Sequence, residues 1–171
     1  MRVRTPVGRL PATAVVVANA VFWPCWTVGV GYLSARTPDR AFDHDTVVTR
    51  LRPVECDGRW YREQWRIDRW KDRLPERGAV FGGFAKRSVG AGAPELVEQF
   101  VVETRRAETA HWAMAAGAAV TGLWNPWWAL PVNVAVGAAL NLPCVAVQRY
   151  NRARLTRLIA RRSGVAATRW K

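Results

Sequence analysis

Two long stretches without charge constrain this chain more than any other feature. Residues 10–35 contain no Asp, Glu, Lys, Arg or His, and residues 109–148 contain only His111. All 13 acidic residues lie between these stretches, and the formal net charge of the 171-residue chain is +13. Because about 20 apolar residues cross the hydrocarbon core of a bilayer, the first stretch predicts one membrane-spanning helix. The second stretch is about twice that length and predicts two.

The second stretch is interrupted by Trp-Asn-Pro-Trp-Trp at residues 124–128. Asn and Pro favour a turn, and Trp favours the membrane–water interface. The sequence therefore predicts an all-α integral membrane protein with about three transmembrane helices: a span at 11–34, a helix at 95–124 that enters the membrane, and a span at 128–148. The alternative is a hairpin buried in a soluble protein, which would need a partner to cover a very apolar surface.

The distribution of Lys and Arg predicts how these helices are oriented. The residues before the first span hold three of them, residues 36–106 hold 15, and the residues from 149 onward hold eight. We therefore expect a multi-pass protein of the cell membrane with its N-terminus outside. The interfacial helical region at 35–94 and the basic tail at 149–171 are then cytoplasmic. The N-terminal stretch also resembles a signal peptide, but its length and its Trp residues favour a retained span.

Residues 59–73 combine aromatic and charged side chains. Trp60, Trp65 and Trp70 are five residues apart, and arginines lie between them. A basic, Trp-rich helix can lie in the membrane interface. An amphipathic helix packed on the rest of the domain fits the pattern equally well, and a strand is less favoured because no β-branched run supports it.

The glycine-rich segment 78–94 includes Lys86 and Arg87 beside Gly82 and Gly83. Open backbone next to cations can cradle a phosphate, although the segment matches neither the P-loop nor the dinucleotide pattern. A flexible linker is the alternative interpretation. We expect a helix to begin at Pro94, with acidic residues in its first turn, and to continue into the membrane.

A charged cluster at residues 103–111 lies where this helix enters the membrane. On a helical wheel, Glu103, Arg106 and His111 share one broad face, and Arg105 points elsewhere, towards lipid phosphate. Glu108 precedes His111 by three residues, so the two side chains can touch. An imidazole oriented by a carboxylate is the usual general-base pair. We therefore predict His111 as the base and Glu108 as its orienting group, with Arg106 steadying an acyl carbonyl or a phosphate.

Two other interpretations of this cluster are open. Glu108-x-x-His111 is also half of a di-iron ligand set, but a second such pair is absent from the sequence, so no metal site is predicted. A histidine at a helix entry can also simply hydrogen-bond a neighbouring span.

A second polar group follows on the next predicted helix. Asn141 and residues 148–152 emerge on the same side of the membrane as His111 in the three-span arrangement, so the two groups can form one pocket. More distal arginines of the tail are expected to be interfacial anchors. The predicted substrate-binding residues are Asn141, Arg149, Tyr150, Asn151, Arg152, Lys71, Lys86, Arg87 and Trp112.

Four stretches of the chain resemble a known family in their order and content. They are Thr37-Pro38-Asp39-Arg40-Ala41-Phe42, residues 65–71, Glu103 to Glu108 with His111-Trp112, and residues 148–156. In these stretches the chain resembles the bacterial glycosyl-4,4'-diaponeurosporenoate acyltransferase family, membrane enzymes of staphyloxanthin-type carotenoid synthesis. The resemblance implies transfer of a fatty acyl group to a sugar hydroxyl of a membrane-bound glycolipid. It supplies no catalytic motif, so the role of His111 rests on the physical argument.

The expected enzyme is therefore an acyltransferase that needs no cofactor besides its co-substrate, an acyl thioester. Its expected partners are membrane lipid, acyl-CoA or acyl carrier protein, and a glycolipid acceptor. The alternative function is that of a non-catalytic membrane subunit that binds anionic lipid and scaffolds a biosynthetic complex. Nucleic-acid binding would also use the +13 charge, but apolar spans explain the composition better, so no nucleic-acid partner is expected.

Overall fold

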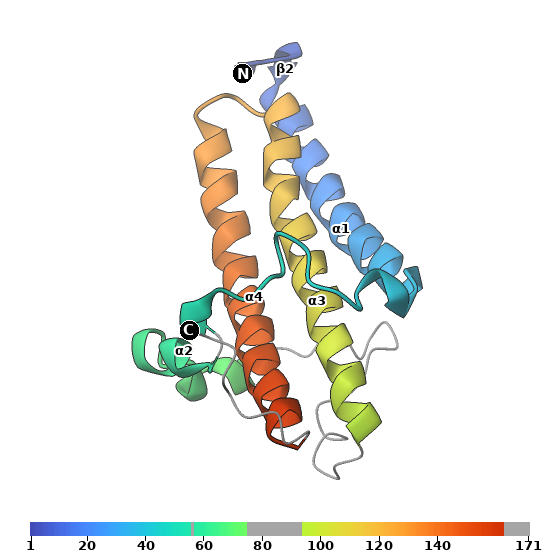
Figure 1. The fold of residues 1–171 in the computed structure, drawn as a ribbon. Helices are drawn as coiled ribbons and strands as arrows, with labels where there is room; N and C mark the ends of the chain where they lie inside the picture. The colour runs from blue at the N-terminus through green and yellow to red at the C-terminus, as the bar shows by residue number, and fades with distance from the viewer. Residues whose placement is uncertain (56, 75–93, 163–171) are drawn as a thin grey trace.

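Three long helices lie side by side in the computed structural model, which describes residues 1–55, 57–74 and 94–162 (Figure 1). They are α1 (Ala12–Arg36), α3 (Pro94–Val120) and α4 (Ala129–Arg162). The predicted helical architecture is thus confirmed. The glycine-rich segment with Lys86 and Arg87, and the last nine residues of the tail, lie outside the described residues.

Two of the three long helices suit a membrane. By length and composition, α1 and α4 are long and apolar enough to cross a bilayer. The N-terminal half of α3 carries the charged cluster, and α3 does not meet the same criterion. The predicted set of about three spans therefore has two clear candidates among the described helices.

The N-terminus forms a small β-hairpin, which differs from the basic flank expected from the sequence. Strands β1 (Arg2–Thr5) and β2 (Gly8–Pro11) pair antiparallel, with Thr5 opposite Gly8. Gly8 has a φ of 120°, which a residue with a side chain rarely adopts, and its carbonyl accepts a hydrogen bond from the Thr5 hydroxyl. Composition indicates only a basic flank before the first span, because the hairpin depends on the single turn residue Gly8.

Small residues let the helices approach closely. A Cβ added to Gly117 of α3 would lie 2.5 Å from Nε1 of Trp26, and this nitrogen donates a hydrogen bond of 3.1 Å to the Ala113 carbonyl. On the other side of α3, a Cβ added to Gly137 of α4 would lie 3.3 Å from the Cβ of Ala118. Close packing through small residues is typical of helix pairs in membranes, where the surrounding lipid is itself apolar.

The connection between α3 and α4, which we call the tip (residues 121–128), lies where the sequence predicted a turn. It begins with a 3-10 helix, Thr121–Leu123, and α4 begins at Ala129. Asn125 of the tip and Asn19 of α1 exchange two hydrogen bonds, Nδ2 of each to Oδ1 of the other, at 2.9 and 3.0 Å. A neutral amide pair therefore fixes α1 to the tip.

The predicted helix over residues 59–73 is wrong as a single element. It consists of α2 (Arg59–Gln64) followed by two 3-10 turns, Ile67–Arg69 and Lys71–Arg73. Arg66 adopts a φ of 46°, which ends the α-helical path just before the first turn. This break turns Ile67 inward, where it is fully buried against Tyr61 and Tyr150.

A mostly irregular stretch with two short 3-10 helices, Asp39–Ala41 and Pro53–Glu55, connects the end of α1 with α2 and passes over α3 and α4 (Figure 1). We call residues 43–55 of this stretch the crossing segment. Its carbonyls and carboxylates accept hydrogen bonds from arginines of both long helices. The crossing segment is the third wall of the site described next.

Candidate active site

Glu108 of α3 is the centre of a buried ionic network. Its side chain is fully buried, and its Oε1 accepts a 2.6 Å hydrogen bond from Nη1 of Arg149. Its Oε2 accepts a 2.5 Å hydrogen bond from Nη2 of Arg152. The indole nitrogen of Trp112 also donates to Oε1, at 3.3 Å. A buried carboxylate is tolerated only when it is paired in this way, so Glu108 serves as the counter-ion of the two arginines.

Arg149 connects three segments of the chain through its guanidinium. Nε and Nη2 donate to the two oxygens of Glu55 at 2.9 and 2.6 Å, which is the bidentate geometry of a strong pair. Nη1 donates to Glu108, and the carbonyls of Val48 and Arg50 accept the remaining two hydrogen bonds at 3.1 and 2.8 Å. All five N–H donors are used within the protein. The predicted role of Arg149 in binding substrate phosphate would therefore require one of these bonds to break.

Arg152 is more deeply buried and less well paired than Arg149. Its side chain is 1% exposed, and its Nη2 donates to Glu108 and to the Thr49 carbonyl. Its Nε and Nη1 find no hydrogen-bond acceptor among the residues that the structure describes. The network therefore contains one fully satisfied cation and one partly satisfied cation, three residues apart on α4.

Glu55 ends the crossing segment and is the second carboxylate of the network. Burial acts to raise the pKa of Glu55, but hydrogen bonds from Arg149, the Tyr61 hydroxyl and the Arg52 backbone outweigh it and lower the pKa from 4.5 to about 2. The Tyr61 hydroxyl donates to Glu55 Oε1 at 2.5 Å. Burial and this carboxylate raise the pKa of Tyr61 above its usual value. Glu55 is thus ionised, and Tyr61 neutral, at physiological pH.

His111 lies one turn nearer the tip than Glu108 and pairs with the facing helix. Its Nδ1 is 3.0 Å from Oδ1 of Asn141. The Asn141 Nδ2 donates to the Gly137 carbonyl at 2.9 Å, which identifies Oδ1 as the acceptor. Nδ1 of His111 must then carry the proton, and in the neutral ring the lone pair is on Nε2. The predicted convergence of His111 with Asn141 is observed, and Asn141, rather than Glu108, makes the hydrogen bond that fixes this tautomer.

Arg105 and Arg106 both bind the polypeptide, which corrects two expectations. Arg105 was expected to face lipid phosphate, but it donates to Asp45 and to the carbonyls of residues 42 and 43. Arg106 was expected at the reacting centre, but it donates to the carbonyls of Ser34 and Thr37 and to Asp39. Glu103 accepts a further hydrogen bond from Arg106 at 3.2 Å. Arg106 therefore holds the C-terminal end of α1 against α3, and Arg105 holds the residues that follow it.

The remaining predicted substrate residues are dispersed. Tyr150 is buried and donates to Asp68 at 2.9 Å, and Lys71 pairs with the neighbouring Asp72 at 3.0 Å. Asn151 is half-buried on α4. Within the described part of the chain, no group of three His, Cys, Asp or Glu is placed to hold a metal ion.

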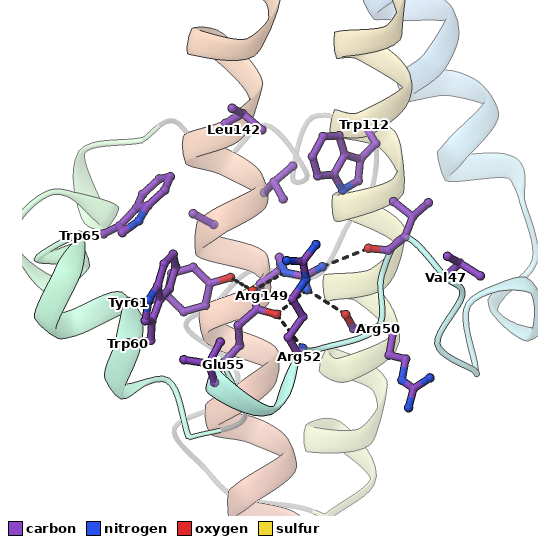
Figure 2. Close-up of a pocket in the computed structure, with 14 residues that line it drawn as sticks. Val47, Arg50, Arg52, Glu55, Trp60, Tyr61, Trp65, Trp112, Leu142 and Arg149 are labelled. Atoms are coloured by element: carbon purple, nitrogen blue, oxygen red, sulfur yellow. Dashed lines mark hydrogen bonds and ion pairs between the residues drawn. The ribbon is translucent and has the colours of Figure 1, made fainter.

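A cavity of about 290 Å³ opens between α2, α3, α4 and the crossing segment. In Figure 2, Trp65 and Tyr61 lie across from Trp112, with Arg52 and Arg149 between these aromatic groups. Trp112 was predicted from the sequence, as was Arg149, but Glu55 and Arg52 were missed because nothing in their local sequence marks them. The cavity is lined by Val47, Val48, Arg50, Arg52, Val54, Glu55, Trp60, Tyr61, Trp65, Trp112, Leu142, Val145, Ala146 and Arg149.

Apolar helices, a buried ionic network and a cavity lined by aromatic and cationic side chains define a small helical protein suited to a membrane. The model of the family described as glycosyl-4,4'-diaponeurosporenoate acyltransferase matches residues 38–161, and the chain belongs to this family. It is therefore an acyltransferase rather than a non-catalytic subunit. The match includes the whole ionic network, the His–Asn pair and every residue that lines the cavity.

Proteins described as glycosyl-4,4'-diaponeurosporenoate acyltransferase in Staphylococcus aureus are similar to this chain over most of its length. Those of strains USA300 and Newman are 23% and 24% identical to it over 141 residues. The alignments cover 82% of this chain and 85% of each relative. No solved structure matches the chain.

Proposed function

We propose that the protein transfers a fatty acyl group from an acyl thioester to a sugar hydroxyl of a glycosylated, membrane-embedded acceptor. The relatives' name describes an acyltransferase acting on a glycosyl-carotenoid acid, and we extend that class of acceptor to this chain. The observation that carries the proposal is the His111–Asn141 pair, which joins the two long helices that contribute to the cavity lining. Trp112 and Leu142, the residues that follow His111 and Asn141, both line the cavity.

In the proposed mechanism, His111 is the general base. Its Nε2 removes the proton from the acceptor hydroxyl as the oxygen attacks the thioester carbonyl, and a tetrahedral intermediate forms. When the intermediate collapses, the carbon–sulfur bond breaks and the imidazolium returns the proton to the departing thiolate. Asn141 holds the ring in the tautomer that this cycle requires, and Glu108 acts indirectly by keeping Arg149 and Arg152 in place.

We further propose three membrane passes, with the crossing segment and the C-terminal end of α4 on the cytoplasmic side. The uncharged part of α3 and the tip's 3-10 helix, residues 109–123, are about 22 Å long at 1.5 Å per residue. This length is short of the roughly 30 Å hydrocarbon core. Glu108 and its arginines then lie within the outer part of the core on the cytoplasmic side, where charges persist because they are paired with one another.

The test is acyl transfer by protein reconstituted in liposomes with palmitoyl-CoA and a glycosylated carotenoid acid. His111→Ala should lower kcat by roughly 10²–10⁴-fold, the usual range for loss of a general base. His44, which lies exposed between α1 and α2, offers the matched control, and His44→Ala should leave kcat unchanged. Near wild-type turnover by folded His111→Ala protein would exclude this mechanism.

A further inference from the structure

Aromatic rings form two facing walls of the cavity. Trp60 lies in α2 and Trp65 directly after it, and the centroids of their rings are 6.1 Å apart. Trp112 lies across from Trp65, on α3 (Figure 2), and the hydrogen bond from its indole nitrogen to the buried Glu108 fixes the direction of its ring. Trp65 is 40% exposed and Trp112 is 36% exposed, so the protein leaves part of each indole uncovered. The space between them therefore suits a ligand with a ring of its own.

The buried charged side chains of the lining are occupied by one another. Glu55 accepts four hydrogen bonds, two from Arg149 and one each from the Tyr61 hydroxyl and the Arg52 backbone. A carboxylate has about four lone-pair sites and a guanidinium has five N–H donors, so Glu55 and Arg149 are both saturated. The side chains of Arg50 and Arg52 are exposed, where water and salt weaken the attraction of a charge for a ligand. Recognition of a ligand therefore falls mainly to the aromatic rings.

A sugar ring is the kind of ligand that such walls recognise. Its hydroxyls point outward from the ring edge, and its faces carry C–H groups. The face of an aromatic ring is negatively polarised, so it attracts these weakly positive C–H groups. A fatty acyl chain has no need of aromatic rings, because aliphatic side chains remove it from water equally well. The indoles of the cavity therefore favour a sugar over the acyl chain of the donor.

The acceptor in the proposed function carries a sugar on a lipid. Resting on that proposed function, we infer that this cavity holds the sugar ring of the acceptor between the indoles of Trp65 and Trp112. The lipid part of the acceptor leaves the cavity past Leu142 and follows the apolar surface of α4, where Leu140 is 70% exposed. The acceptor is thereby placed with its sugar at the charged network and its tail towards the membrane.

The size and depth of the cavity agree with this assignment. Its volume of about 290 Å³ is at the lower limit of ligand pockets, which hold roughly 300–1,000 Å³. A space of this size admits a sugar ring, whereas a long lipid chain must lie outside it. His111 and Asn141 precede the lining residues Trp112 and Leu142 by one position each, a rise of about 1.5 Å along a helix. The proposed base is therefore at the same depth as this end of the cavity.

Trp65→Leu tests the aromatic wall, since it removes one indole and leaves an apolar side chain. The Michaelis constant for the glycosylated acceptor should rise about fivefold, as expected for one lost aromatic contact, and that for palmitoyl-CoA should not change. Trp65→Tyr keeps an aromatic face and should restore most of the loss. Trp127→Leu, at a tip residue that is 82% exposed and outside the cavity lining, is the matched control and should change neither constant. A rise in the donor's constant alone, or in neither constant, overturns the inference.

A competitor without the sugar separates the two parts of the acceptor. The carotenoid acid that lacks its sugar should inhibit wild type and Trp65→Leu with the same inhibition constant, because only the sugar contacts Trp65. An inhibition constant that rises in Trp65→Leu would place the lipid part in the cavity and overturn the inference.

Sugar binding can also be measured without turnover. Saturation-transfer NMR of methyl β-glucoside with protein in lipid nanodiscs should show transfer to the sugar C–H protons for wild type and Trp127→Leu, and severalfold less for Trp65→Leu. Equal transfer for all three proteins, or none for wild type, overturns the inference whether or not the protein is active. Wild-type protein that binds the glucoside in this way but transfers no acyl group overturns the proposed function alone.

Discussion

The two ends of the α3–α4 hairpin are held by opposite kinds of polar chemistry. At one end, Glu108 and Glu55 pair with Arg149 and Arg152, all four of them charged and buried. At the tip, the neutral amides of Asn19 and Asn125 hold α1 in place through two reciprocal hydrogen bonds. The charged end also receives the crossing segment, whereas the tip contacts α1.

This difference follows the cost of placing each group in an apolar medium. A neutral amide with its hydrogen bonds made is tolerated deep in a membrane, and such pairs contribute modestly. A charge is expensive there and tends to lie near water or beside a partner. The charged end carries the cavity and the crossing segment. The proposed site therefore lies at the end of the hairpin where charge can be accommodated.

The largest expected effect comes from Glu108→Gln. Removing this charge leaves Arg152 buried without its counter-ion, and breaking one side of a buried pair costs about 3–5 kcal/mol. The free energy of unfolding in detergent micelles measures the loss. Glu98→Gln, at an exposed position of the same helix, should have little effect.

A double variant sharpens this test. Glu108→Gln with Arg152→Met removes the uncompensated cation as well, so it should be less destabilised than Glu108→Gln alone. Additive losses would show that the two side chains do not act as a pair.

Acid should weaken the charged end and leave the tip unaffected. Because the pKa of Glu55 is lowered from 4.5 to about 2, its contribution is fully present above pH 4.5 and is lost as the pH falls towards 2. The contribution is on the order of 3 kcal/mol. The melting temperature should therefore fall less steeply between pH 6 and pH 2 for Glu55→Gln than for wild type. Parallel declines in the two proteins would contradict the lowered pKa.

The smallest effect is expected at the tip. Asn125→Leu removes two interhelical hydrogen bonds, which in membranes contribute about 0.6 kcal/mol each on average, so the loss should be about 1 kcal/mol. A double-mutant cycle with Asn19→Leu should recover a coupling of the same size, independent of pH. Zero coupling would mean that other contacts hold α1 to the tip.

The sequence predicted those parts of the fold whose signal lies within a single helix or turn. Uncharged stretches located α1 and the α3–α4 hairpin, and the Asn-Pro turn located the tip, because these signals are local. The approach of His111 to Asn141 was also predictable, because two antiparallel helices place residues at equal depth opposite each other.

The sequence failed where partners come from irregular backbone. The helical wheel gave the directions of Arg105 and Arg106 but not their partners, which are carbonyls and carboxylates at the end of α1 and in the irregular chain that follows it. Glu55 was missed for the same reason, since its partner Arg149 is 94 residues away. The left-handed conformation of Arg66, which ends the predicted helix, depends on the burial of Ile67 and carries no local signal.

The contact of Arg106 with the last turn of α1 has a consequence for biosynthesis. Arg106 follows Thr37, whose carbonyl at the C-terminal end of α1 it also satisfies, by 69 residues, so the ribosome releases the end of α1 well before the cation that caps it. A carbonyl without a donor is costly in hydrocarbon, and water must fill this role while the intervening chain is made. In the proposed three-pass arrangement, the C-terminal end of α1 is thereby kept at an aqueous surface during translation until α3 arrives beside it.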